Sequence, residues 1–91
     1  MSWEDRTHRI KHDGPVTVWQ QVVDDITADI ESGELSSDSR LPSEAELAEI
    51  YGVARGTVRR ALTALVESGT VIVVHGRGTF VTSGPGHQRG E

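Results

Sequence analysis

The short break at Tyr51, Gly52 and Val53 lies between two segments with helical periodicity in the middle of this 91-residue chain. The first segment begins at Ser43, which forms a capping box with Glu46, because each side chain can satisfy a backbone N–H of the other residue. The second segment, residues 55–68, repeats apolar residues about every 100° and ends at Gly69. Two helices joined by a tight turn that contains glycine form a helix-turn-helix, so the spacing predicts that motif.

A helix is predicted before the motif and a hairpin after it. Residues 15–33 place apolar residues at three- and four-residue spacing, with Pro15 at the start and Gly33 as the stop. Residues 70–74 and 79–82 predict two strands around a turn with two glycines. We therefore expect an α+β fold, a winged helix-turn-helix with three helices and a C-terminal β-hairpin wing, over residues 15–82. Residues 1–14 are expected to form a flexible N-terminal arm, and residues 83–91 a disordered tail.

Positive charge is concentrated in the second half of an acidic chain, which has 14 Asp and Glu against 9 Lys and Arg. Residues 1–50 hold 4 basic and 12 acidic side chains, a net charge of −8, whereas residues 51–91 hold 5 basic and 2 acidic, a net charge of +3. Such asymmetry favours contact of one face with a polyanion. Charge alone leaves open the alternative of a solvated basic helix face.

Composition and length exclude several classes of function. Ninety-one residues give one domain at most, with no room for a cofactor domain or a deep substrate cleft. The chain has no cysteine, and no nucleophile, base and orienting group come together, so we expect neither an enzyme nor a cofactor. His8 and His12 could share a helix face, but no third ligand is near, so no metal site is expected. No membrane span or signal peptide is visible, and we expect a cytoplasmic protein.

Three arginines, Arg55, Arg59 and Arg60, lie on the predicted outer face of the second helix, near its N-terminal end. In a helix-turn-helix this end enters the DNA major groove first. The planar donor fork of arginine matches guanine O6 and N7, or two phosphate oxygens. Gly56 lets the backbone approach closely, and Thr57 can contact a phosphate or a thymine methyl. The hypothesis requires the three guanidinium groups to project outward together.

The hairpin is interpreted as a wing with a slim tip. Gly76 and Gly78 keep the tip narrow, and His75 or Arg77 can reach into the minor groove, where the negative potential is strongest.

The run LPSEAELAEIYGVARGTVRRALTALVESGTVIVVHGRGTFV, residues 41–81, resembles the DNA-binding domain of the GntR family of bacterial transcriptional regulators. The motifs are L-P-S-E-x-x-L-A, G-V-x-R-x-T-V-R-x-A-L and G-x-G-T-F-V, and the resemblance covers residues 15–82. The VRRAL and GRGTFV runs are most similar to the HutC-type branch.

The resemblance implies a winged helix-turn-helix that binds a near-palindromic DNA operator as a dimer, and we expect a repressor. Because the chain stops after the wing, we expect a monomer or weak homodimer in solution. Arg55 and Arg59 match the family's base- and phosphate-contacting arginines, and Thr57 its recognition-helix threonine. The DNA-binding residues are expected to be Ser43, Arg55, Gly56, Thr57, Arg59, Arg60, His75, Gly76 and Arg77. Family members normally continue into a metabolite-binding domain that follows the wing, so the chain is either a cut-out domain or a complete short regulator.

Two positions depart from the family pattern. Ala45 stands where relatives often have Arg or Lys, and Ala54 where they usually have Ser or Thr as the helix N-cap. Losing that cap costs about 1 kcal/mol of helix stability. We expect weaker backbone anchoring, or support from another residue such as Arg40 or Arg60.

A protein-interaction module is the alternative function. The acidic first helix could dock a basic partner through Asp24, Asp25, Asp29 and Glu31.

Overall fold

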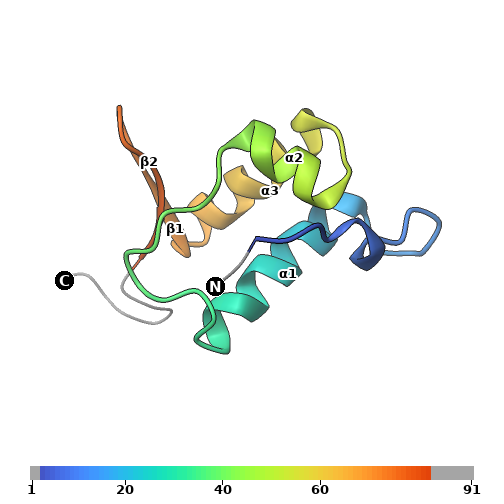
Figure 1. The fold of residues 1–91 in the computed structure, drawn as a ribbon, viewed down its shortest axis with the longest axis horizontal. Helices are drawn as coiled ribbons and strands as arrows, with labels where there is room; N and C mark the ends of the chain where they lie inside the picture. The colour runs from blue at the N-terminus through green and yellow to red at the C-terminus, as the bar shows by residue number, and fades with distance from the viewer. Residues whose placement is uncertain (1–2, 83–91) are drawn as a thin grey trace.

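The computed structural model describes residues 3–82. These residues form a short 3-10 helix, η1 (Thr7–Arg9), the helices α1 (Val18–Glu31), α2 (Glu44–Tyr51) and α3 (Arg55–Glu67), and the strands β1 (Val71–Val74) and β2 (Gly78–Val81). The two strands pair antiparallel, with Val71 opposite Val81 and Val74 opposite Gly78. Figure 1 shows the hairpin projecting from one side of the packed helices. The predicted winged helix-turn-helix is confirmed. Residues 83–91, predicted as a tail, lie outside the described residues.

The helix starts follow local side-chain chemistry. The first helix begins later than Pro15, because Thr17 is its N-cap and accepts a hydrogen bond from the backbone N–H of Gln20 at 3.3 Å. The predicted capping box at the start of α2 is confirmed: Ser43 Oγ accepts from the Glu46 N–H at 3.1 Å, and Glu46 Oε1 accepts from the Ser43 N–H at 2.9 Å. Ala54 precedes α3 with no side-chain cap, as predicted.

Ala54→Ser is therefore expected to stabilise the domain by about 1 kcal/mol. Ala54 already has the extended backbone of an N-cap, with φ −68° and ψ 150°, so a serine hydroxyl there can accept from the first turn of α3. Urea denaturation monitored by circular dichroism measures the change. Ala45→Ser, inside α2, is the matched control and should give no gain. Equal or lower stability for Ala54→Ser would contradict the expectation.

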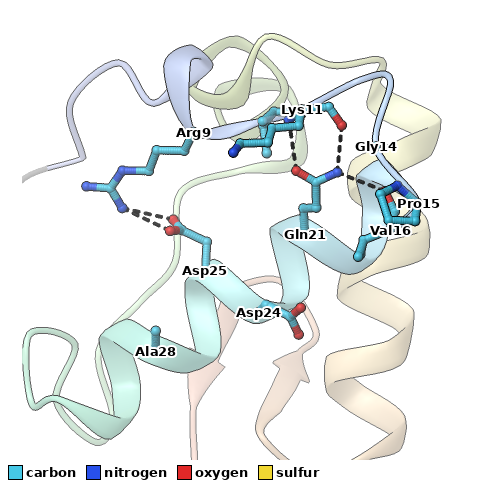
Figure 2. A pocket seen from close by; sticks show the side chains of 10 residues that line it. Arg9, Lys11, Gly14, Pro15, Val16, Gln21, Asp24, Asp25 and Ala28 are labelled. Carbon is cyan, nitrogen blue, oxygen red and sulfur yellow. Dashed lines mark hydrogen bonds and ion pairs between the residues drawn. The ribbon is translucent and has the colours of Figure 1, made fainter.

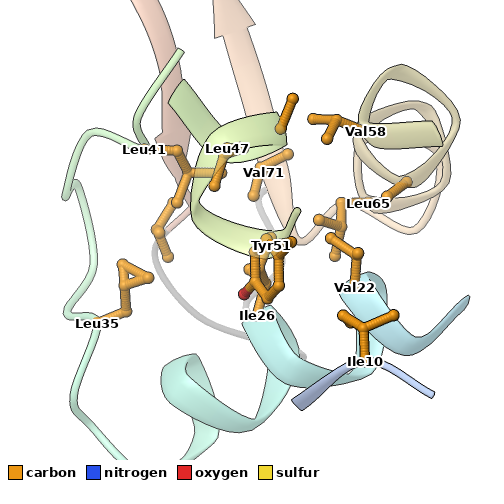
Figure 3. Packing of buried hydrophobic residues seen from close by; sticks show 13 residues of the cluster. Ile10, Val22, Ile26, Leu35, Leu41, Leu47, Tyr51, Val58, Leu65 and Val71 are labelled. Atoms are coloured by element: carbon orange, nitrogen blue, oxygen red, sulfur yellow. The ribbon is translucent and has the colours of Figure 1, made fainter. Parts of the chain in front are cut away.

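The core lies where the three helices meet the base of the hairpin. Figure 3 shows side chains of α1, α2, α3 and β1 converging, with Tyr51 of α2 next to Ile26 of α1. Both of these side chains are fully buried. The buried cluster consists of Ile10, Val22, Ile26, Leu35, Leu41, Leu47, Ala48, Tyr51, Val58, Ala61, Leu65, Val71 and Val81. Helix α3 packs against both α1 and α2, so the core fixes the direction in which its outer face points.

Part of the segment that precedes α2 runs along the hairpin. The backbone N–H of Leu41 donates to Thr79 O at 2.8 Å, and that of Val81 donates to Ser39 O at 2.8 Å. Arg40 and Phe80 form the antiparallel bridge between these bonds. The edge of β2 is thereby paired, and the wing is tied to the segment that leads into α2.

The segment predicted as an arm packs on the helices. The Arg6 side chain is only 3% exposed, and its backbone N–H donates to Ile50 O at 2.7 Å, near the end of α2. The Arg6 guanidinium contacts Asp25 Oδ2 at 2.7 Å, Asp29 Oδ2 at 2.8 Å and the Tyr51 hydroxyl at 3.1 Å, and it stacks on Trp3 at 4.5 Å. Flexibility of residues 1–14 stays a prediction about motion, but residues 3–10 are in contact with α1 and α2.

A second set of contacts holds the loop between η1 and α1. Figure 2 shows the Gln21 side chain bridging this loop. Its Oε1 accepts from the Lys11 N–H at 2.8 Å, and its Nε2 donates to Lys11 O at 2.8 Å and to Val16 O at 2.9 Å. Arg9 Nη1 pairs with Asp25 Oδ1 at 3.0 Å in the same view. Asp25 therefore faces two arginines and is withdrawn from the acidic outer surface of α1.

Candidate nucleic-acid interface

The turn between α2 and α3 exposes the N-terminal end of α3. Gly52 ends α2 in the left-handed conformation, with φ 68°, and the Val53 N–H returns to Ala48 O at 3.0 Å. Val53 packs partly on the core, while Arg55 and Gly56 are exposed. Three turn residues thus leave the first backbone N–H groups of α3 open to a partner.

Two of the predicted arginines share one carboxylate. Arg59 donates through Nε and Nη2 to the two oxygens of Glu44, each at 2.9 Å, and Arg55 Nε lies 3.5 Å from Glu44 Oε1. The Arg55 and Arg59 side chains remain 65% and 66% exposed. The hydrogen bonds from Arg59 hold the pKa of Glu44 below its usual value, and Glu44 raises the pKa of Arg59. Both side chains are therefore largely exposed to solvent, but their guanidinium groups are turned onto the Glu44 carboxylate of α2.

Arg60 does not join this pair. Its guanidinium lies over the Trp19 ring of α1, 4.7 Å from the centroid. The expectation that the three guanidinium groups project outward together is therefore wrong: Arg55 and Arg59 pair with Glu44, and Arg60 lies against a neighbouring helix. Arg60 would have to leave Trp19 to reach a duplex, and its DNA contact stays a prediction.

Gly56 and Thr57 complete the first turn of α3. A Cβ on Gly56 would meet nothing within 4 Å, so packing inside the domain does not require glycine there. Thr57 is half-buried, and its backbone N–H donates to Ala54 O at 3.0 Å. Because Gly56 is exposed and has no side chain, the backbone of α3 can be approached closely there by an outside partner.

Ser43 lies at the N-terminal end of α2, beside Glu44. Its Oγ accepts from the Glu46 N–H at 3.1 Å, and its side chain is exposed. A hydroxyl that accepts one hydrogen bond still has its own proton to donate, so Ser43 can cap the helix and donate to an anion together.

The wing tip consists of His75, Gly76 and Arg77, all exposed. The Arg77 N–H donates to Val74 O at 2.9 Å and closes the turn, and Gly76 has φ 79°. No side-chain hydrogen bond or ion pair engages Arg77 among the described residues. The tip is therefore narrow and carries an available cation.

Sequence reasoning missed Glu44 as a partner of the recognition arginines. Its position one residue after the N-cap indicates only a favourable interaction with the helix dipole. The link to Arg59 crosses 15 residues of sequence and depends on how α2 packs against α3. Between residues 3 and 82, no three His, Asp or Glu side chains are grouped to hold a metal ion, and no helix is long and apolar enough to cross a bilayer.

The model of the bacterial regulatory proteins of the gntR family matches residues 19–81 of this chain. The chain belongs to the GntR family. Its match lies within the resemblance seen in residues 15–82 and contains α2, α3 and the wing.

Two of the curated relatives that the chain matches are named as repressors. The HTH-type transcriptional repressor NagR of Bacillus subtilis is 42% identical over 73 residues, covering 80% of this chain and 30% of the relative. The histidine utilization repressor of Klebsiella aerogenes is 38% identical over 72 residues, covering 79% of this chain and 30% of the relative. These relatives confirm the predicted HutC-like branch. The chain spans about 30% of the length of these two relatives.

Solved structures of GntR proteins share the fold. YtrA from Sulfolobus acidocaldarius, a GntR-family transcription factor, is 33% identical with a TM-score of 0.78, covering 86% of this chain and 82% of that chain. The DNA-binding domain of AraR in complex with operator ORX1 is 35% identical with a TM-score of 0.70, covering 80% of this chain and 94% of that chain.

Proposed function

We propose that residues 15–82 are the DNA-binding domain of a bacterial transcriptional repressor and bind a specific operator in double-stranded DNA. One observation carries the proposal: Arg55 and Arg59 lie outward and about two-thirds exposed at the N-terminal end of α3, directly after the tight turn. AraR, which shares this fold, has been solved with operator DNA. Such a domain needs no catalytic group, metal or cofactor.

In the proposed complex α3 enters the major groove with its N-terminal end leading. The Arg59 and Arg55 forks contact guanine edges or phosphates, and Thr57 contacts a phosphate or a thymine methyl. Gly56 allows the helix backbone to approach the duplex. Ser43 donates to a phosphate at the N-terminal end of α2, where backbone N–H groups also favour an anion.

The wing tip is proposed to contact the adjacent minor groove. Gly76 keeps the tip slim, and the unengaged guanidinium of Arg77 is attracted by the negative potential of a narrow groove. His75 lies beside it and can donate from its ring.

We infer that the operator is near-palindromic and that two copies of the domain occupy half-sites about 34 Å apart, one helical turn of DNA. In solution the domain is a monomer or a weak homodimer, and it pairs on DNA. Its place of action is the bacterial cytoplasm, at the nucleoid.

Selection of bound sequences from random duplex DNA tests the function. We expect a near-palindromic motif, bound with an affinity that falls steeply between about 50 and 200 mM salt, because each neutralised phosphate adds about −0.9 to the log–log slope. An Arg55→Ala, Arg59→Ala double variant is the control and should enrich no motif. Failure of the parent to enrich any sequence, or a flat salt dependence, would contradict the proposal.

The alternative, a protein-interaction module that uses the acidic first helix, is less well supported. Asp25 and Asp29 of that helix contact Arg6 within the domain, which leaves Asp24 and Glu31 as its exposed carboxylates. Capture of a basic protein in place of operator DNA would favour this alternative.

A further inference from the structure

In B-form DNA a single sugar-phosphate strand separates the major groove from the neighbouring minor groove. The inference rests on the proposed function, in which α3 lies in the major groove and the wing in the adjacent minor groove. In that complex the strand between the two grooves crosses the surface between α3 and the wing. The side chains that line this surface therefore face phosphates.

A groove of about 650 Å³ occupies this surface. Arg59 and Thr63 of α3 line one side of it, and Gly78 and Thr79 of β2 line the other. Residues 40–44 also line the groove, so Arg40 is part of its lining. The groove therefore joins the two elements proposed to contact DNA.

The backbone of Arg40 pairs with the wing, and its side chain extends along the wing toward the tip. Its backbone bridges to Phe80, yet a Cβ added at Gly78, two residues nearer the tip, would lie only 2.8 Å from Arg40 Nε. Gly78 also has φ 126°, a backbone conformation that favours glycine, and the absence of a Cβ there leaves room for the Arg40 side chain. The Arg40 side chain therefore lies close to the wing and is exposed to solvent.

Arg40 is also available to an outside anion. No ion pair or side-chain hydrogen bond engages its guanidinium within residues 3–82, whereas Arg59 in the same groove is bound to Glu44. Glu46 is near enough to feel the charge of Arg40, but its carboxylate is bound to the Ser43 N–H at 2.9 Å. The remaining carboxylate of the groove, Glu67, lies at the end of α3, about 12 Å along the helix axis from Arg59.

We propose that Arg40 holds a backbone phosphate of the DNA strand that crosses between α3 and the wing. Its planar fork can donate two hydrogen bonds to phosphate oxygens without breaking an ion pair. A contact of this kind positions the domain and carries no sequence information. Of the two residues expected to compensate for Ala45, the structure favours Arg40, because Arg60 stacks on Trp19.

Arg40→Gln tests the assignment, because glutamine keeps a polar side chain but loses the charge and the fork. Binding to the selected operator and to a scrambled duplex is measured by fluorescence anisotropy over about 50 to 200 mM salt. We expect about tenfold weaker affinity for both duplexes, an unchanged ratio between them, and a log–log salt slope smaller by about 1. Arg40→Lys should retain most of the slope.

Lys11→Gln is the matched control, since it makes the same change of formal charge in the loop after η1, on the far side of the helices from the wing (Figure 1). Its salt slope should stay near that of the parent. Single phosphates of the operator can also be replaced by neutral methylphosphonates, one at a time. At one position the replacement should weaken binding of the parent and leave the affinity of Arg40→Gln unchanged. An Arg40→Gln slope equal to that of the parent or of Lys11→Gln would overturn the assignment while the proposed function stood. A parent that bound no duplex would overturn both.

Discussion

Replacing Arg59 with alanine is expected to weaken operator binding by about 100-fold or more and to leave the domain folded. The Arg59 side chain is 66% exposed, and its two side-chain hydrogen bonds go to Glu44, so its loss removes little from the core. A bidentate contact between arginine and guanine is worth about 1–3 kcal/mol of discrimination.

The loss should exceed that of a single contact because of Glu44. Without Arg59, the Glu44 carboxylate is paired only with Arg55, whose Nε is 3.5 Å away. Its negative charge is then less fully neutralised and repels the phosphates of DNA. The Arg59→Ala, Glu44→Gln double variant should therefore recover part of the sequence-independent affinity, with no recovery of specificity.

Gel-shift titration with operator and scrambled duplexes measures both quantities. Arg59→Lys keeps the charge and loses the fork, so it should retain affinity for the scrambled duplex and lose most discrimination. Arg77→Ala should weaken binding less and relax the preference for a narrow minor groove. Operator binding by Arg59→Ala at the parent's affinity would refute the role assigned to this side chain.

The second large effect is on stability: Arg6→Met should lower the free energy of unfolding by about 3 kcal/mol. Methionine keeps an apolar stem under Trp3, but the buried contacts to Asp25, Asp29 and Tyr51 lose their cation. Removing one partner of a buried ion pair leaves an uncompensated charge, which costs more than the pair itself contributes. Urea denaturation followed by circular dichroism gives the value.

Arg9→Met is the matched control, because Arg9 pairs with the same Asp25 but is 43% exposed. Its cost should stay below about 1 kcal/mol, as for other exposed ion pairs. An equal loss of free energy of unfolding in the two variants would show that burial does not make the Arg6 contacts more stabilising than those of Arg9.

The Arg6 contacts also carry a pH signature. Burial alone would raise the pKa of Asp25, but hydrogen bonds from Tyr51, Arg9 and Arg6 outweigh it and hold that pKa below the usual value. A carboxyl with a lowered folded pKa stabilises the fold above its unfolded value of about 3.9, and that stability is lost as the pH falls through the folded pKa. The parent should lose stability on acidification below about pH 4, and Arg6→Met should lose less.

Much of the helix-turn-helix could be predicted because its signals are local. The capping box links Ser43 to Glu46 across three residues, and the missing cap at Ala54 is visible in one residue. Gly52, Gly33 and Gly69 lie at helix ends in the left-handed conformation that favours glycine. Helix α1 begins at Val18, three residues after the predicted start at Pro15, because the Thr17 side chain caps its first turn.

The candidate site could be predicted only in part. The helical period places Arg55 and Arg59 on the outer face, but it does not reveal that Glu44 binds both of them. It also groups Arg60 with them, whereas the packing of α1 against α3 turns that side chain onto Trp19. Each of these contacts depends on the position of a second element, which periodicity does not supply.

The sequence by itself determined the helices of the DNA-reading motif, the hairpin and the family, because capping, glycine conformation and apolar period act over three or four residues of the same segment. Only the tertiary structure decided which cations are engaged and which are available. The Arg6 contact with Tyr51 spans 45 positions, and Arg40 reaches Gly78 across the wing. Such contacts form only when separate elements pack together, so they cannot be predicted from a local pattern of residues.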